Sequence, residues 1–254
     1  MHPKKRILPI LACLAALTPL APTAQANARK FTYSYQATTL KAGQVEYEQW
    51  VTIKRDKKID RDYTRIDIRH EIEWGITDNL QAAIYYDWRY EDSKKKNDYT
   101  NMRDVSIELI YNTSSPTTDL LGSAIYAEIA LGEDKFKIET KLLLQKNINQ
   151  WVFAWNGIAE AEWEGDDYSD TKGVFAQTLG ASYQISHALS VGAELLHQAE
   201  YKDWSTWSDT SVYLGPNLSY SKNQWWVTVT PMYQLTDNPG QADYQIRVLF
   251  GYQF

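Results

Sequence analysis

The sequence has a single cysteine, Cys13, in 254 residues. Cys13 lies in an apolar stretch near the N-terminus, so residues 27–254 contain no thiol. This excludes disulfides, thiolate metal sites and cysteine nucleophiles from that part of the chain. The chain also lacks an excess of positive charge, since its formal net charge is −6. Nucleic-acid binding draws on positive charge, and we therefore expect no nucleic-acid partner.

Long apolar runs are missing after the first 26 residues. Residues 1–6 include three basic side chains, residues 7–20 are mostly apolar, and residues 24–26 read Ala-Gln-Ala. This order is typical of a secretory signal peptide, and we expect cleavage after Ala26. Beyond it, no stretch of about 20 residues is apolar enough to cross a membrane as a helix.

Aromatic residues, in contrast, are plentiful, with 18 Tyr and 10 Trp. Over residues 244–254 an apolar or aromatic side chain occupies every second position, which places six bulky groups on one face of a strand. Such a face suits a strand whose outer side meets lipid. The segment resembles the closing strand of bacterial outer-membrane β-barrels, which end in an aromatic residue read by the barrel-assembly machinery. That residue is here Phe254.

The same alternation recurs along the chain and predicts twelve strands, an even number as single-chain bacterial barrels require. We therefore expect an all-β fold, a transmembrane antiparallel up-and-down β-barrel of about 12 strands over residues 44–254, in the outer membrane of a Gram-negative bacterium. Residues 27–43 would be an N-terminal lead-in or a plug. The partners expected are outer-membrane lipid, lipopolysaccharide and small solutes. The predicted strands span residues 45–54, 64–74, 80–90, 103–111, 123–131, 136–145, 151–163, 173–185, 189–201, 211–220, 225–235 and 244–254.

The connections and the aromatic residues fit this topology. Short turns are expected at the periplasmic side and longer polar loops outside. The predicted outer loops are residues 55–62, 91–102, 132–135, 164–172, 202–209 and 236–243. Aromatic girdles are expected at both membrane interfaces. Their members are Trp74, Tyr111, Trp151, Tyr183, Tyr220, Trp225, Tyr252 and Phe254 at the periplasmic side, and Trp88, Tyr90, Trp163, Tyr201 and Tyr233 outside.

Two segments near the start of the barrel carry a family resemblance. Residues 39–50 read Thr-Leu-Lys-Ala-Gly-Gln-Val-Glu-Tyr-Glu-Gln-Trp, and residues 72–81 read Ile-Glu-Trp-Gly-Ile-Thr-Asp-Asn-Leu-Gln. They resemble the first strands of porin-like barrels similar to the phenol-degradation-pathway family of putative outer-membrane transporters. The resemblance implies a channel-like role and transfers no catalytic residue.

The inward positions of the predicted strands carry many charges, and acids outnumber bases. A water-filled path lined by such groups selects solutes by sign, so we expect a porin-like channel that prefers cations or polar solutes. The alternative is a charge network that fills the lumen. The predicted lumen-lining residues are Glu46, Glu48, Arg65, Asp67, Arg69, Glu71, Glu73, Asp87, Arg89, Asp104, Glu108, Glu128, Lys137, Glu139, Lys141, Glu160, Glu162, Glu194 and Arg247.

Enzymatic readings have little support in the sequence. A lipid-modifying hydrolase needs a nucleophile, a histidine base and an orienting group together. His70 and His197 fall on the predicted lipid-facing side and His187 in a turn, so no catalytic residue is assigned. The acidic loop of residues 164–170 offers oxygen ligands without an EF-hand spacing, and no cofactor or metal is expected. A closed structural or adhesive barrel is the other alternative.

Overall fold

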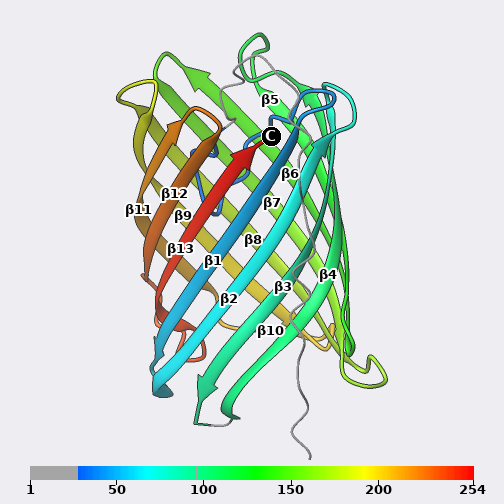
Figure 1. Ribbon diagram of the computed structural model, residues 1–254. Helices are drawn as coiled ribbons and strands as arrows, with labels where there is room; N and C mark the ends of the chain where they lie inside the picture. The colour runs from blue at the N-terminus through cyan, green and yellow to red at the C-terminus, as the bar shows by residue number, and fades with distance from the viewer. Residues whose placement is uncertain (1–27, 95) are drawn as a thin grey trace, which may run out of the picture.

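The computed structural model describes residues 28–94 and 96–254, so the predicted signal peptide lies outside the described residues. The described chain forms one antiparallel sheet whose last edge pairs with its first, because β8 bonds to β9 and β13 to β1. The predicted closed barrel of 12 strands is therefore confirmed (Figure 1). No helix in this part of the chain is long and apolar enough to cross a membrane.

Thirteen strands are present in the described residues, and twelve of them form the wall. The thirteenth, β10, is a two-residue strand that pairs with the outer end of β9. The bounds are β1 (Val45–Lys57), β2 (Asp60–Gly75), β3 (Leu80–Ser93), β4 (Lys96–Ser114), β5 (Gly122–Leu131), β6 (Lys135–Ile148), β7 (Trp151–Glu164), β8 (Asp170–Gln184), β9 (Leu189–Lys202), β10 (Thr206–Trp207), β11 (Ser211–Lys222), β12 (Trp225–Gln234) and β13 (Ala242–Gln253).

The alternation in the sequence decides which face of each strand meets the surroundings. On β4, Val105, Ile107 and Leu109 point outward and are exposed, whereas Ser106 and Glu108 between them are buried inside. The exposed apolar groups continue onto neighbouring strands, since Ile107 lies opposite Ile84 on β3 and Ile129 on β5. In water such a surface would be unfavourable, so the exterior is that of a membrane-spanning barrel.

Aromatic side chains lie at both ends of the barrel. We call the end that carries Val45 and Gln253 the plug end, and the opposite end the loop end. Aromatic rings gather at both: Trp151 packs against Tyr183 at the plug end, and Tyr201 packs against Trp207 of β10 at the loop end. Rings at both interfaces are expected of an outer-membrane barrel.

Two predicted outer loops are largely strand. Within residues 55–62, Arg55 pairs with Thr64 and Lys57 with Asp60, across a register shift at Asp56. Residues 91–102 continue the β3–β4 hairpin, since β3 ends only at Ser93 and β4 begins at Lys96 (Figure 1). The prediction was wrong there because charged residues were assigned to loops, although beyond the membrane both faces of a hairpin can carry charge.

Residues 28–43 lie inside the barrel at the plug end and have no regular secondary structure (Figure 1). We call residues 28–40 the plug segment. Its aromatic and aliphatic side chains are almost completely enclosed: Phe31, Ala37 and Leu40 are at most 2% exposed. Residues 41–43 then join it to β1 at the rim, where Gly43 N–H donates to the carbonyl oxygen of Gly75.

Candidate functional site

The plug segment is fixed by hydrogen bonds from its backbone to side chains of the barrel wall. The strongest group of bonds ends on Glu194 of β9. Its carboxylate accepts from the backbone N–H groups of Thr32, Tyr33 and Ser34 at 2.7, 2.8 and 2.9 Å, and from the Thr230 hydroxyl at 2.7 Å. Bonds to an ionised acceptor are stronger than neutral ones, so Glu194 is the main anchor.

Amide side chains continue this pattern around the inner wall. Asn156 of β7 accepts from Tyr35 N–H at 2.6 Å and donates to the Tyr35 carbonyl at 3.0 Å. Gln145 of β6 accepts from Ala37 N–H at 2.8 Å, and Gln81 of β3 accepts from Leu40 N–H at 2.9 Å. These wall side chains replace the partners that an irregular buried backbone would otherwise lack.

The wall is also shaped to receive the segment. The Phe31 ring lies so close to Gly180 of β8 that a Cβ there would come within 2.6 Å of it. The Tyr35 ring packs edge-on against Tyr126, with centroids 5.3 Å apart, and the guanidinium of Arg247 stands 4.0 Å from the Tyr33 ring. These contacts make the plug segment part of the packed interior.

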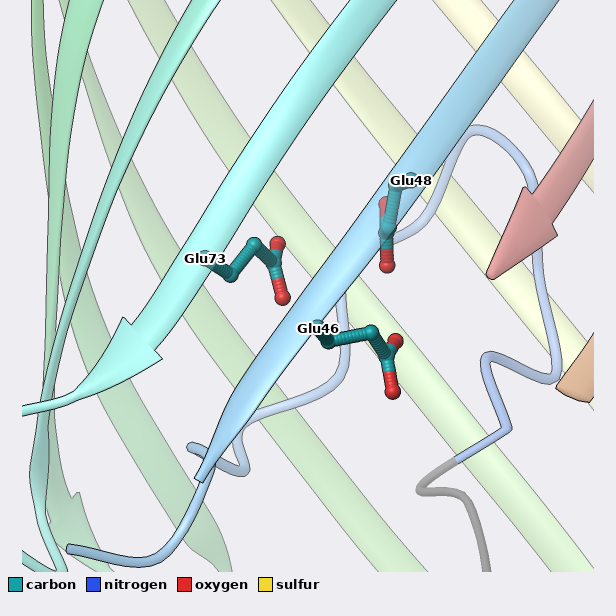
Figure 2. A group of neighbouring side chains, drawn as sticks. All are labelled: Glu46, Glu48 and Glu73. Carbon is teal, nitrogen blue, oxygen red and sulfur yellow. The ribbon is translucent and has the colours of Figure 1, made fainter. Parts of the chain in front are cut away.

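Beside the plug segment, on the part of the wall that β1, β2 and β4 form, is a group of buried carboxylates. Glu46 and Glu48 lie on β1, and their cross-strand neighbours on β2 are Glu73 and Glu71. Glu108 of β4 completes the set, and all five are at most 3% exposed. Figure 2 shows Glu46, Glu48 and Glu73 with their carboxylates on the same side of the sheet. We call these five residues the acidic ring.

One cation from the plug segment reaches into the acidic ring. Arg29 Nε donates to Glu48 at 2.9 Å, and Arg29 Nη2 donates to Glu73 at 3.0 Å. Burial alone would lower the pKa of Arg29, but Glu48 and the other nearby carboxylates hold that pKa well above its usual value. Arg29 is therefore charged, and it ties the start of the plug segment to the wall. Two indole N–H groups also donate to the ring, from Trp226 to Glu46 and from Trp50 to Glu48.

The lumen widens on the loop side of the plug segment into a cavity of about 540 Å³, which we call the vestibule. Tyr33 and Tyr35 of the plug segment form its floor. Its lining has equal numbers of acidic and basic side chains, but they are not evenly mixed. Strands β13, β1, β2 and β3 contribute mostly bases, and strands β4 to β9 mostly acids.

On the basic wall, arginines hold aspartates by short ion pairs. Arg69 contacts Asp87 at 2.9 Å, and Asp67 receives both Arg65 at 2.8 Å and Arg89 at 2.7 Å. The side chains of Lys54 and Arg247 line the same wall. Because bases outnumber acids there, this wall is positive.

On the acidic wall, glutamates stand directly opposite one another on successive strands. Glu108, Glu128, Glu139 and Glu160 are cross-strand neighbours from β4 to β7. Like charges opposite each other are destabilising, so this row needs cations. Lys137 supplies one, with its Nζ 2.7 Å from Glu128, 3.2 Å from Glu139 and 3.7 Å from Glu160.

The structure places all the predicted lumen-lining residues on the inner face, in two groups. The acidic ring and Glu194 lie around the plug segment. The remainder line the vestibule: Arg65, Asp67, Arg69, Asp87, Arg89, Asp104, Glu128, Lys137, Glu139, Lys141, Glu160, Glu162 and Arg247. The predicted acid excess is therefore concentrated at the plug end, whereas the vestibule is balanced.

Several residues that hold the plug segment were not predicted from the sequence. Arg29 lies outside the alternating pattern, and Asn156, Gln145 and Gln81 are uncharged. The sequence did contain an indication of these residues. Amide side chains that face inward near the plug end of a strand neither contact lipid nor pair with a charged group. Such amides indicate a buried backbone in need of hydrogen bonds.

The three histidines of the described residues lie away from the lumen. His70 is on the outer face of β2, where its Nδ1 lies 2.7 Å from the Tyr47 hydroxyl and its ring stacks on Tyr86. His197 is on β9, opposite Val212 of β11, and His187 is exposed in the β8–β9 turn. His70 is thus held by two tyrosines of the aromatic exterior.

Phe254, the predicted assembly signal, lies at the plug end and is exposed. Its backbone N–H donates to the Val45 carbonyl at 3.0 Å, which continues the pairing of β13 with β1. Its ring packs edge-on against Tyr252 at 5.3 Å.

Solved structures with a similar fold are outer-membrane barrels. An outer membrane channel from Pseudomonas putida F1 is 13% identical, with 86% of this chain and 98% of that chain covered and a TM-score of 0.64. The NanC porin is 9% identical, with 81% and 98% covered and a TM-score of 0.56. The translocator domain of the autotransporter NalP from Neisseria meningitidis is 11% identical, with 85% and 90% covered and a TM-score of 0.52.

These neighbours differ in what they do, so the shared architecture shows the outer-membrane barrel fold and leaves the function to the site. No curated protein matches the chain. A family model matches residues 23–248, nearly the whole chain. The chain belongs to that family, the family of unknown function DUF6662.

Proposed function

We propose that the protein is a porin-like outer-membrane channel for small polar solutes, and that the plug segment closes it at the periplasmic end. The observation that carries this proposal is the form of the lumen. A vestibule of about 540 Å³ ends at Tyr33 and Tyr35, which belong to a single irregular segment rather than to the wall. Movement of that segment alone would join the vestibule to the plug end.

The charges suggest which solutes would pass. The vestibule has a positive wall facing a negative wall, an arrangement that orients polar solutes without excluding either sign. The acidic ring lies at the plug end, next to the plug segment. When the plug segment leaves the barrel, Arg29 leaves with it, and the acidic ring loses that positive charge. Five glutamates on one part of the wall of the path then favour cations, so the cation preference belongs to the unplugged state.

Closure at the periplasmic end also fixes how the barrel is oriented in the membrane. We place the plug end in the periplasm, the apolar exterior in outer-membrane lipid and the loop end among the lipopolysaccharide headgroups. The terminal ring of Phe254, exposed at the plug end, is then available to the barrel-assembly machinery before insertion.

Ion preference can be measured on a barrel that lacks residues 28–40, refolded into planar bilayers. Across a KCl gradient we expect a reversal potential of the sign that indicates cation preference. Glu46→Gln combined with Glu48→Gln should shift it toward zero, because two charges leave the acidic ring. Glu200→Gln on β9, an inward carboxylate outside the ring, is the matched control and should change it less. An anion preference in the unsubstituted barrel would contradict the proposed selectivity.

A further inference from the structure

The acidic ring contains a second group of carboxylates, of which Arg29 contacts one, Glu73. One oxygen each from Glu71, Glu73 and Glu108 lie within 4.8 Å of one another. Glu71 and Glu108 are completely buried. The Arg29 guanidinium contacts Glu73 and Glu48 together. The three carboxylates therefore share a single ion pair, the one between Arg29 and Glu73.

The more informative feature is the hydrogen bonding of the four carboxylate oxygens of Glu71 and Glu108. Within the described structure none of the four has a hydrogen-bond partner. A buried polar atom without a partner is rare and costly, and a buried ionised one is more so.

The neighbouring cations are held by other carboxylates. Arg69 donates to Asp87 at 2.9 Å, and Lys141 Nζ lies 2.7 Å from Glu139, with the Tyr126 ring 3.7 Å away. Each stands near the acidic ring and weakens the repulsion within it. Neither supplies a hydrogen bond to Glu71 or Glu108.

We propose that Glu71, Glu73 and Glu108 bind a divalent cation of the calcium type. Hard cations take carboxylate oxygens, and Ca²⁺ accepts six to eight of them with one or two oxygens per carboxylate. Glu71 and Glu108 can each offer both oxygens, and Glu73 offers one. Of the three carboxylates, Glu73 also borders a small cavity of about 40 Å³, which it shares with Arg29 and Glu48.

Such a cation would also stabilise the plug segment. Glu73 would bridge the cation and Arg29, so that the cation, the carboxylates and the start of the plug segment form one connected unit. Glu71 and Glu108 join strands β2 and β4 across β3, so the cation also links the wall on either side of Gln81, the partner of Leu40. Cation binding at these carboxylates does not require that the barrel conducts.

The test is titration of CaCl₂ into the full mature chain, refolded from inclusion bodies into detergent and freed of metal with EDTA. Refolded protein carries no lipopolysaccharide, which itself binds calcium. Calorimetry should show one saturable site, and thermal unfolding should move to higher temperature with added CaCl₂. MgCl₂ should compete weakly, because Mg²⁺ demands a tighter octahedral shell than these carboxylates provide.

Glu71→Gln with Glu108→Gln should weaken calcium binding at least about tenfold, since two of three ligand charges are lost. The matched control is Asp166→Asn with Asp167→Asn, which neutralises two carboxylates of the exposed β7–β8 loop and should leave binding intact. Heat-modifiable gel migration shows that each variant is folded, and the single Glu108→Gln variant serves if the double one does not fold. Absence of a saturable site below about 1 mM, the weak end of extracellular calcium modules, would overturn the proposal. Loss of binding in the loop variant instead would do the same.

Discussion

In the Glu194→Gln variant, the ratio of open to closed channel is expected to be at least about tenfold higher than in the natural chain. Glu194 accepts three backbone N–H groups of the plug segment at 2.7–2.9 Å. A glutamine has one acceptor oxygen instead of two and turns an N–H₂ group toward donors. Hydrogen bonds to a charged group contribute about 1.5–3 kcal/mol, and each 1.4 kcal/mol is roughly a factor of ten in the ratio of released to seated plug.

Single-channel recording in planar bilayers measures this ratio as the fraction of time spent open. Glu200→Gln is the matched control, because Glu200 lies on the same strand and its carboxylate accepts a long hydrogen bond from the Gln241 side chain at 3.4 Å. Equal open fractions in Glu194→Gln and in the natural chain would show that the anchor does not control the plug.

The second large effect is expected from Lys137→Met, which should lower the free energy of unfolding by about 3–5 kcal/mol, the usual cost of removing one partner from a buried ion pair. Lys137 is the shared cation of Glu128, Glu139 and Glu160, and its side chain is 11% exposed. Without it, Glu128 and Glu160 lose the lysine that contacts them, while Glu139 keeps Lys141 at 2.7 Å.

Denaturant titration of the barrel in lipid vesicles gives the unfolding free energy. Lys172→Met is the control, since Lys172 pairs with Glu162 at 2.6 Å and its side chain is 34% exposed. It should cost much less, as exposed pairs contribute about 1 kcal/mol or less. A loss below about 1 kcal/mol for Lys137→Met would mean that water in the vestibule screens these charges as well as bulk solvent does.

The wall could be predicted from the sequence because lipid outside and charge inside impose a period of two. On β2, Ile66, Ile68 and Ile72 alternate with Asp67 and Glu71, and the structure keeps that register without a slip from Thr64 to Gly75. A one-residue error would have turned carboxylates toward lipid. The strands therefore needed no information beyond local alternation.

The plug could not be predicted in the same way. Its position depends on bonds between residues far apart in the chain, such as Thr32 with Glu194 and Tyr35 with Asn156. Residues 28–43 have no period that selects a strand or a helix, and most hydrogen bonds of the plug backbone are made to side chains of the closed wall. The division of charge between vestibule and acidic ring was hidden for a related reason, because it depends on the height of each side chain along the barrel.

Conductance of the refolded mature chain, compared with the same chain lacking residues 28–40, is the measurement that tests the account most directly. We expect the full chain to be closed for most of the recording and the shortened chain to show steady conductance. Heat-modifiable migration must first show that both are folded barrels. A folded, shortened barrel that stays silent would contradict the channel, and a full chain that conducts as steadily as the shortened one would contradict the plug.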